Sequence, residues 1–217
     1  MKRRLLITGS EGTVGKALCA DLDGDYELVA TTRPGRSEDG LDVCDAADWQ
    51  RFMASVGDDL YALIHTVGAF ELQSIKDCDP ATFDRLILSN LNSAFYAYEA
   101  CRARLRASQG RLIFFGLAGV QTARPETNLA AYTAAKAGLS SLVASAAAAE
   151  AEHGLTCNLI APGLLHNAQA DEVARYQIPA GRSARTAELC AAVRFLLGDE
   201  AAQITAATLP LSGGWRL

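Results

Sequence analysis

The sequence predicts an α/β fold built on a doubly wound parallel sheet. Short runs of β-branched and apolar residues alternate along the whole chain with longer segments of helical character. The short runs are apolar on both faces, as the strands of a buried parallel sheet must be. No Pro/Gly/Ser-rich linker or internal repeat interrupts this alternation, and 217 residues can fill one core. We therefore expect a single domain over residues 1–217.

Each element is predicted from its own segment. The expected strands are Arg4–Thr8, Tyr26–Thr32, Ala62–Thr66, Arg111–Phe115, Thr156–Ala161 and Ala207–Leu211, with a further short strand at Gly40–Val43. The expected helices are Val14–Leu22, Ala46–Ser55, Pro80–Leu105, Leu129–His153 and Thr186–Leu197. Small side chains dominate Ser140–Ala151, so this part of its helix can pack closely in the core or against another subunit, or simply cover the sheet.

Composition excludes several classes of protein. Half of the residues are hydrophobic and 21% are charged, which is enough apolar surface for a folded core. The net charge of -5 gives no overall attraction to nucleic acid, and no run approaches the ~20 apolar residues of a membrane span. The apolar run after the basic start is too short for a signal peptide, and no CxxC spacing occurs. We expect a cytoplasmic protein with reduced cysteines, no metal, and no nucleic-acid or membrane partner.

A glycine turn joins the first predicted strand to the first predicted helix. Its sequence over residues 8–15 is Thr-Gly-Ser-Glu-Gly-Thr-Val-Gly. Glycines allow the backbone to approach a pyrophosphate, and the free N–H groups at a helix start favour its negative charge. Such turns also serve simply as connections, so the signal is weak alone. The candidate dinucleotide-binding residues here are Thr8, Gly9, Gly12, Thr13, Val14 and Gly15.

The end of the second predicted strand indicates which dinucleotide would bind. An acidic residue there would receive the ribose 2′-hydroxyl of NAD, but this strand ends in Thr32 and Arg33. A guanidinium suits the 2′-phosphate of NADP, with Arg36 as a second candidate. The alternative for each arginine is a solvated loop charge. We expect NADP as the cofactor, with NAD possible.

Tyr132 and Lys136 stand at helical spacing in the segment Ala-Ala-Tyr-Thr-Ala-Ala-Lys-Ala-Gly-Leu, residues 130–139. With the glycine turn, this pair makes the chain resemble a short-chain dehydrogenase/reductase over nearly its whole length. The resemblance implies a Rossmann fold in which Tyr132 is the general acid/base. It also implies that Lys136 holds the nicotinamide ribose and lowers the tyrosine pKa, which fits two side chains on one helix face.

Further segments match the family in the same order along the chain. Asn90 matches the asparagine of the family's proton relay, with Asn92 as the fallback. By resemblance, Asp42 and Val43 hold the adenine, Gly68 belongs to the cofactor site, and Pro162 and Gly163 form the loop beside the nicotinamide. The C-terminal segment Leu-Ser-Gly-Gly-Trp, residues 211–215, resembles the family's last strand and turn.

Several positions depart from the family pattern. The glycine spacing is that of the family's longer members, Asn167 replaces a usual threonine, and the expected substrate lid around residues 166–178 is short. The strand end where the family carries its catalytic serine reads Phe-Gly-Leu-Ala-Gly, residues 115–119, with no hydroxyl. Candidate substitutes for that serine are Thr122, His65, a backbone N–H of residues 116–118, or an ordered water. For His65 itself we favour a core histidine with satisfied ring nitrogens over a ligand contact.

The resemblance implies an NADP-dependent oxidoreductase that transfers a hydride to a carbonyl or a conjugated double bond of a small molecule. The alternatives are a cofactor-binding protein with a regulatory or scaffold role, which the missing serine would favour, and a non-redox biosynthetic enzyme. Family members generally associate through the two long helices, so the resemblance also implies a homodimer or homotetramer. Substrate identity lies in loops that one sequence does not reveal.

Overall fold

A six-stranded sheet forms the centre of the molecule. The computed structural model describes residues 2–36, 40–122, 125–166 and 177–216. Its strands are β1 Arg4–Thr8, β2 Glu27–Ala30, β3 Leu60–His65, β4 Arg111–Phe115, β5 Thr156–Pro162 and β6 Thr208–Leu211. Their order is β2-β1-β3-β4-β5-β6, and every neighbouring pair is parallel. The predicted doubly wound parallel sheet is confirmed.

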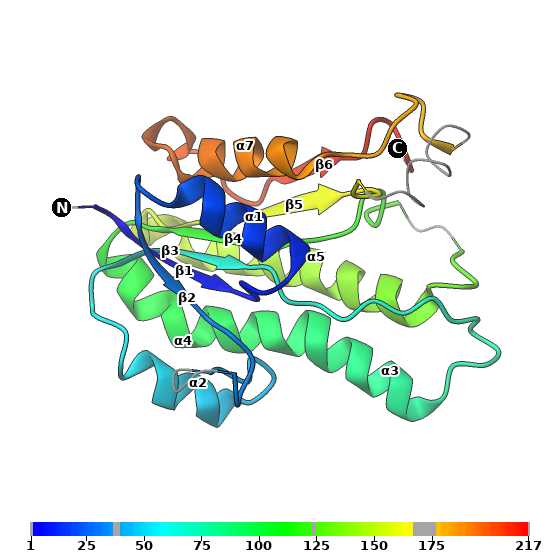
Figure 1. Cartoon of the computed structure of the whole chain (residues 1–217), viewed down its shortest axis with the longest axis horizontal. Helices are drawn as coiled ribbons and strands as arrows, with labels where there is room; N and C mark the ends of the chain where they lie inside the picture. The colour runs from blue at the N-terminus through cyan, green and yellow to red at the C-terminus, as the bar shows by residue number, and fades with distance from the viewer. Residues whose placement is uncertain (1, 37–39, 123–124, 167–176, 217) are drawn as a thin grey trace.

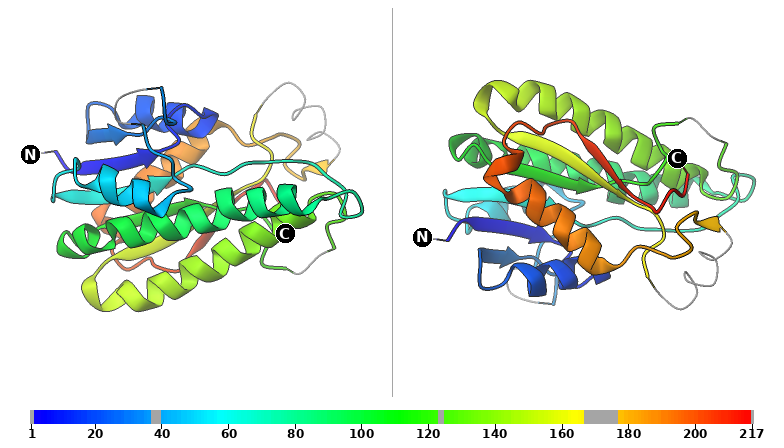
Figure 2. Two further views of the ribbon diagram at one scale, coloured as in Figure 1. Left: turned by 90° about the horizontal axis from the view of Figure 1, so that it is seen from below. Right: turned by 90° about the horizontal axis from the view of Figure 1, so that it is seen from above.

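Helices cover both faces of this sheet (Figures 1 and 2). On one face lie α1 Thr13–Leu22 and α7 Thr186–Leu197. On the other lie α2 Ala46–Met53, α4 Ser93–Ala107 and α5 Ala130–Glu150. Short 3₁₀ turns at Ala151–His153 and Asp199–Ala201 follow α5 and α7.

The alternation of side chains along each strand produces these two layers. Leu5 and Ile7 of β1 pack in the core with α1 and α7, whereas Leu6 between them packs with α2, α4 and α5. All three side chains are fully buried. The sheet therefore has an apolar core on each face, as a parallel sheet between helices requires.

The strand order reverses between β1 and β3. From β1 the chain winds outward to β2, and from β3 it winds in the opposite direction to β6. The connections that follow β1 and β3 therefore leave on opposite faces of the sheet, toward α1 and α4, and the crevice between them is where ligands bind in open α/β sheets.

The predicted helix Pro80–Leu105 is interrupted in the structure. It consists of α3 Pro80–Ile87, a π-helical turn Leu88–Asn92, and α4. In the wide turn the N–H of Ser93 reaches back to the carbonyl of Leu88. Turns of this kind occur mostly at functional sites, and this one carries Asn90.

The short strand predicted at Gly40–Val43 does not exist, so that prediction was wrong. Leu41 N–H donates to the Thr32 carbonyl at 3.0 Å, and the chain then turns at Asp42 toward α2. A single backbone hydrogen bond followed by a turn is too short to form a β-ladder. The other predicted strands are found with ends shifted by up to two residues.

Three further observations limit the classes of site that this fold contains. All six cysteines are free thiols. Within residues 2–36, 40–122, 125–166 and 177–216, no helix has the length and apolarity needed to cross a bilayer. The same residues contain no group of three His, Cys, Asp or Glu side chains placed to hold a metal ion.

Candidate active site

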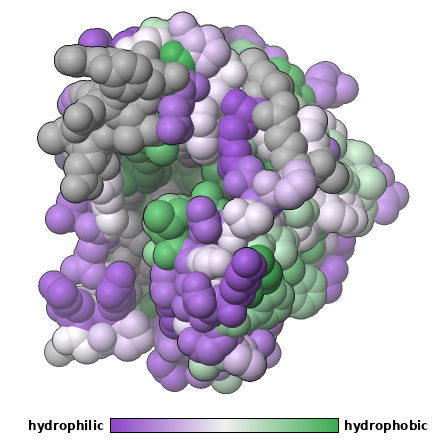
Figure 3. All heavy atoms as spheres, turned by 90° about the vertical axis from the view of Figure 1, so that its right-hand side faces the viewer, coloured by the Kyte–Doolittle hydropathy of each residue, from purple (hydrophilic) through white to green (hydrophobic). Residues whose placement is uncertain are grey.

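A pocket of about 680 Å³ opens at the carboxyl edge of the sheet, at the ends of β1 and β3 where the strand order reverses. The space-filling view of this end shows the surface hollowed, with apolar atoms at the bottom of the hollow (Figure 3). The pocket is lined by Gly9, Glu11, Gly12, Lys16, Thr31, Thr32, Arg33, Pro34, Arg36, Leu41, Asp42, Val43, Cys44, Thr66, Val67, Gly68, Ala69 and Ser89. Its position is the one that the strand order predicts for a dinucleotide.

The glycine turn needs glycine at two positions for steric reasons. Gly9 has a φ of +74°, and a Cβ there would lie 2.7 Å from Thr66 Oγ1. A Cβ at Gly15 would overlap the Gly9 carbonyl. Gly12 is the N-cap of α1 and lines the pocket, so the first helical turn, with its unsatisfied N–H groups, begins at the pocket. The turn therefore has the close backbone approach and the helix start that a phosphate requires.

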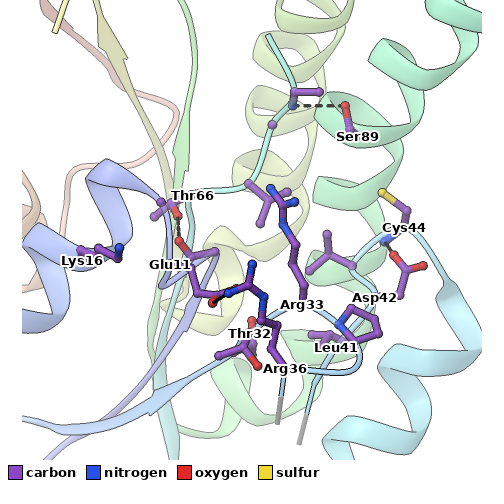
Figure 4. Close-up of a pocket in the computed structure, with 18 residues that line it drawn as sticks. Glu11, Lys16, Thr32, Arg33, Arg36, Leu41, Asp42, Cys44, Thr66 and Ser89 are labelled. Carbon is purple, nitrogen blue, oxygen red and sulfur yellow. Dashed lines mark hydrogen bonds and ion pairs between the residues drawn. The ribbon is translucent and has the colours of Figure 1, made fainter. Parts of the chain in front are cut away.

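Two arginines stand at either end of a tight turn after β2. In the turn Arg33–Arg36, the N–H of Arg36 donates to the Arg33 carbonyl at 3.2 Å, and Gly35 has a φ of +80°. Pro34 followed by a glycine with positive φ is typical of a type II turn, which is stiff. Arg33 and Arg36 both line the pocket, and Figure 4 shows Arg33 extending along it.

The structure brings six of the predicted cofactor residues to this pocket: Gly9, Gly12, Arg33, Asp42, Val43 and Gly68. Thr13, Val14 and Gly15 lie in the first turn of α1, and Thr8, Pro162 and Gly163 lie at strand ends, none of them among the lining residues. Among the lining residues that sequence reasoning missed, Glu11 and Cys44 have no distinctive spacing. Lys16 could have been found, because it lies one helical turn after Gly12.

Tyr132 and Lys136 lie one turn apart near the start of α5. Lys136 is 4% exposed, and its Nζ lies 5.6 Å from the centroid of the Tyr132 ring. Lys136 Nζ donates to the Phe115 carbonyl at 2.8 Å, which fixes the ammonium at the end of β4. Burial lowers the pKa of Lys136 to about 8.

The expected lowering of the tyrosine pKa is not found in this structure. Burial raises the pKa of Tyr132 to about 12, because desolvation penalises the phenolate. Phe70 contributes to the covering, with its ring edge-to-face on Tyr132 at 5.2 Å between centroids. The Tyr132 hydroxyl consequently keeps its proton at neutral pH.

Asn90 lies behind this pair on the π-helical turn. Its amide nitrogen donates to the carbonyls of Ala69 at 2.8 Å and Leu86 at 3.0 Å. Its Oδ1 is buried and lacks a partner among the described residues. A Cβ at Gly68 would overlap that oxygen and would lie 3.3 Å from Lys136 Nζ. Gly68 therefore lets Asn90, Lys136 and the pocket meet at one point.

His65 is a core histidine, as we favoured. Its side chain is 2% exposed, its Nδ1 lies 2.8 Å from Thr8 Oγ1, and its Nε2 lies 3.1 Å from Ser93 Oγ. Ser93 donates its own proton to the Ser89 carbonyl, so it accepts from Nε2–H, and Thr8 donates to Nδ1. Burial, reinforced by the charge of Lys136, lowers the pKa of His65 to about 3. The Thr8 hydroxyl is thus directed into the core.

The segment after β4 packs tightly against β5. A Cβ at Gly116 would lie 3.0 Å from Leu159 Cγ, so the packing of Leu159 favours glycine there. The N–H of Gly116 donates to Ile160 and that of Ala118 to Pro162. Thr122 Oγ1 donates to the Gly119 carbonyl at 2.8 Å. Thr122, His65 and the N–H groups of Gly116 and Ala118 are therefore engaged elsewhere, which leaves the N–H of Leu117 and an ordered water as the remaining predicted substitutes for the serine.

The expected substrate lid falls largely outside the described residues, which omit 167–176. At its start, His166 N–H donates to the Ala184 carbonyl at 2.8 Å. The loop after β3, whose Phe70 contacts Tyr132, is held by Gln73 N–H donating to the Asn128 carbonyl and Ile75 N–H donating to the Thr127 carbonyl. This loop presents the exposed apolar side chains of Phe70, Leu72 and Ile75.

Comparison with known proteins decides the family. Residues 26–216 match the family described as enoyl-(acyl carrier protein) reductase. The chain belongs to this family of short-chain dehydrogenases/reductases. It is 30% identical to the 3-oxoacyl-[acyl-carrier-protein] reductase FabG of Escherichia coli, over 96% of this chain and 95% of that protein. It is 29% identical to an acetoacetyl-CoA reductase of Allochromatium vinosum, over 99% and 98% of the two chains. The chain is therefore an oxidoreductase of the family that its sequence resembles.

Solved structures agree with this membership. An oxidoreductase of the short-chain dehydrogenase/reductase family from Burkholderia thailandensis is 26% identical, with a TM-score of 0.87 over 99% of this chain and 92% of that chain. The structure of ElxO with NADP bound superposes with a TM-score of 0.90 at 19% identity, over 99% and 98% of the chains. These superpositions confirm the predicted Rossmann fold.

Proposed function

We propose that this enzyme uses NADPH to reduce a carbonyl group or a conjugated double bond of a small molecule. The observation that carries the proposal is the meeting of Tyr132, Lys136 and Asn90 beside a glycine-lined pocket at the point where the strand order reverses. The named activities of the FabG and acetoacetyl-CoA reductase relatives support the reaction type.

The residues present fit a dinucleotide. Gly9 and Gly15 leave no room for a side chain at the turn, which is what close approach of a pyrophosphate to the backbone requires. Arg33 and Arg36 would hold a 2′-phosphate, and Asp42 with Val43 would hold the adenine. Gly68, Pro162 and Gly163 would line the nicotinamide end, and Lys136 would hold its ribose. When bound, the cofactor supplies the hydride.

The side chains of this site would then donate the proton that the reduction needs and restore it afterwards. Tyr132 keeps its hydroxyl proton at neutral pH and can donate it to the substrate oxygen as negative charge develops there. Lys136, fixed by the Phe115 carbonyl, provides a positive charge behind the ring that favours the resulting phenolate. Asn90 Oδ1 lacks a partner among the described residues and can accept a hydrogen bond from a water. That water would return a proton to the Tyr132 phenolate. Phe70 packs edge-to-face on the Tyr132 ring and covers part of it.

Arg33→Ala tests the cofactor assignment. A guanidinium facing a phosphate makes charge-assisted hydrogen bonds that NADH cannot supply. We expect the wild type to bind NADPH more tightly than NADH, and Arg33→Ala to lose about 10-fold in NADPH affinity with little change for NADH. Fluorescence titration with each cofactor measures both constants, and NADPH oxidation with a panel of ketones, quinones and enones then identifies the reaction. Equal affinity for the two cofactors in the wild type would contradict the assignment.

Assembly is a further part of the proposal. We propose a homodimer or homotetramer formed through α4 and α5, supported by the aromatic side chain of Phe95, which is 45% exposed on α4, and by the alanines of α5. Light scattering at micromolar concentration should give a mass at least twice that of one chain, and a monomer would contradict it.

The six free cysteines support a reducing, cytoplasmic location.

A further inference from the structure

A carboxylate lies inside the pocket, where a negatively charged cofactor would bind. Glu11 stands in the glycine turn between Gly9 and Gly12 and lines the pocket. Its Oε1 lies 3.5 Å from Nη1 of Arg36, which also lines the pocket (Figure 4). Both side chains are partly exposed, at 36% for Glu11 and 69% for Arg36, so the pair gains little from Coulomb attraction and can separate easily.

The two partners of this ion pair come from segments held in fixed positions relative to each other. Ser10 N–H and Oγ both donate to the Thr31 carbonyl, at 3.3 and 2.8 Å, which ties the glycine turn to the end of β2. The stiff turn from Arg33 places Arg36 beside that junction. Glu11 therefore faces the arginine turn because the backbone places it there, and not merely because a long side chain happens to reach it.

We propose that Glu11 reduces the preference for NADPH over NADH by competing with the 2′-phosphate for Arg36. This inference rests on the proposed function. In the free enzyme the carboxylate pairs with Arg36, and binding of NADPH must break that pair and bring phosphates close to a negative side chain. A ribose 2′-hydroxyl carries no charge and can donate a hydrogen bond to a carboxylate. Glu11 thus weakens NADPH binding and preserves binding of NADH, although the strand end lacks the usual acidic residue.

Glu11→Gln is the variant that tests this competition. It removes the charge, keeps the size of a partly exposed side chain, and leaves the glycines of the turn in place. We expect NADPH to bind about 3- to 10-fold more tightly at low ionic strength, the effect of one unit charge several Å away near a surface, with NADH unchanged or weaker. In an Arg36→Gln background the gain from Glu11→Gln should fall by at least half, because the ion pair is already absent.

Glu27→Gln provides the matched control. Glu27 pairs with Arg4 at 2.8 Å at the amino end of β2, away from the pocket, so the variant changes the net charge equally without touching the site. Its NADPH affinity should equal that of the wild type. An unchanged or weaker NADPH affinity in Glu11→Gln would overturn the competition while leaving the proposed function intact. A wild type that binds neither cofactor would overturn the proposed function, and this inference with it.

Discussion

Tyr132→Phe should lower the turnover of NADPH-dependent reduction by about 10²-fold or more while leaving cofactor affinity nearly unchanged. The substitution removes only the hydroxyl, and the ring keeps its edge-to-face contact with Phe70. Loss of the proton donor raises the barrier without affecting the phosphate-binding end of the pocket. A factor of 10² corresponds to about 2.7 kcal/mol, the size expected for one positioned general acid.

Tyr26→Phe is the matched control for this experiment, because Tyr26 precedes β2 at the opposite end of the sheet. Steady-state kinetics of both variants with a substrate from the ketone, quinone and enone panel separates kcat from KM. Full activity in Tyr132→Phe would show that the tyrosine is not the proton donor. A regulatory, scaffold or non-redox role would then become the better explanation of the retained pocket.

The sequence sufficed for the fold because the signals that determine it are local. The buried runs at Leu5–Ile7 and Leu112–Phe115 are apolar on both faces, and they are strands that pack against helices on both sides. Gly9 could be placed in the pocket because the glycine turn between the first strand and helix occurs together with the other segments that match the family. The family resemblance supplied Tyr132, Lys136 and Asn90, whose spacing alone is common on solvated helices.

Other features depend on contacts between distant segments, which a single sequence does not show. The π-helical turn arises where the Asn90 amide bonds both the Leu86 carbonyl in its own helix and the Ala69 carbonyl in a loop 21 positions away. Helical periodicity cannot reveal that second partner. The raised pKa of Tyr132 likewise depends on burial by segments distant in the sequence, among them the one that carries Phe70. The charge on Glu11 looked unremarkable until the fold placed Arg36 opposite it.

The buried histidine should make the native state sensitive to acid. Burial lowers the pKa of His65 to about 3, whereas a histidine in the unfolded chain titrates near 6.5. Below pH 6.5 the unfolded state therefore binds a proton that the native state does not, so the free energy of unfolding decreases as pH falls from about 6.5 to 3. This one group should cost about 2 kcal/mol of stability by pH 5 relative to pH 8, and at most about 5 kcal/mol at the acid limit. For a domain whose total stability is about 5–15 kcal/mol, that is a large fraction.

His65→Gln isolates this contribution, because its amide can still accept from Thr8 and donate to Ser93 but does not titrate. Chemical denaturation at pH 8, 6.5 and 5 should show the wild type losing about 2 kcal/mol more than His65→Gln over that range. His153→Gln is the control, since His153 is 38% exposed beside Glu152, and its pH dependence should follow that of the wild type. Parallel curves for the wild type and His65→Gln would mean that His65 accepts a proton in the folded protein, and the neutral Nε2–H form bridging Thr8 and Ser93 would be wrong.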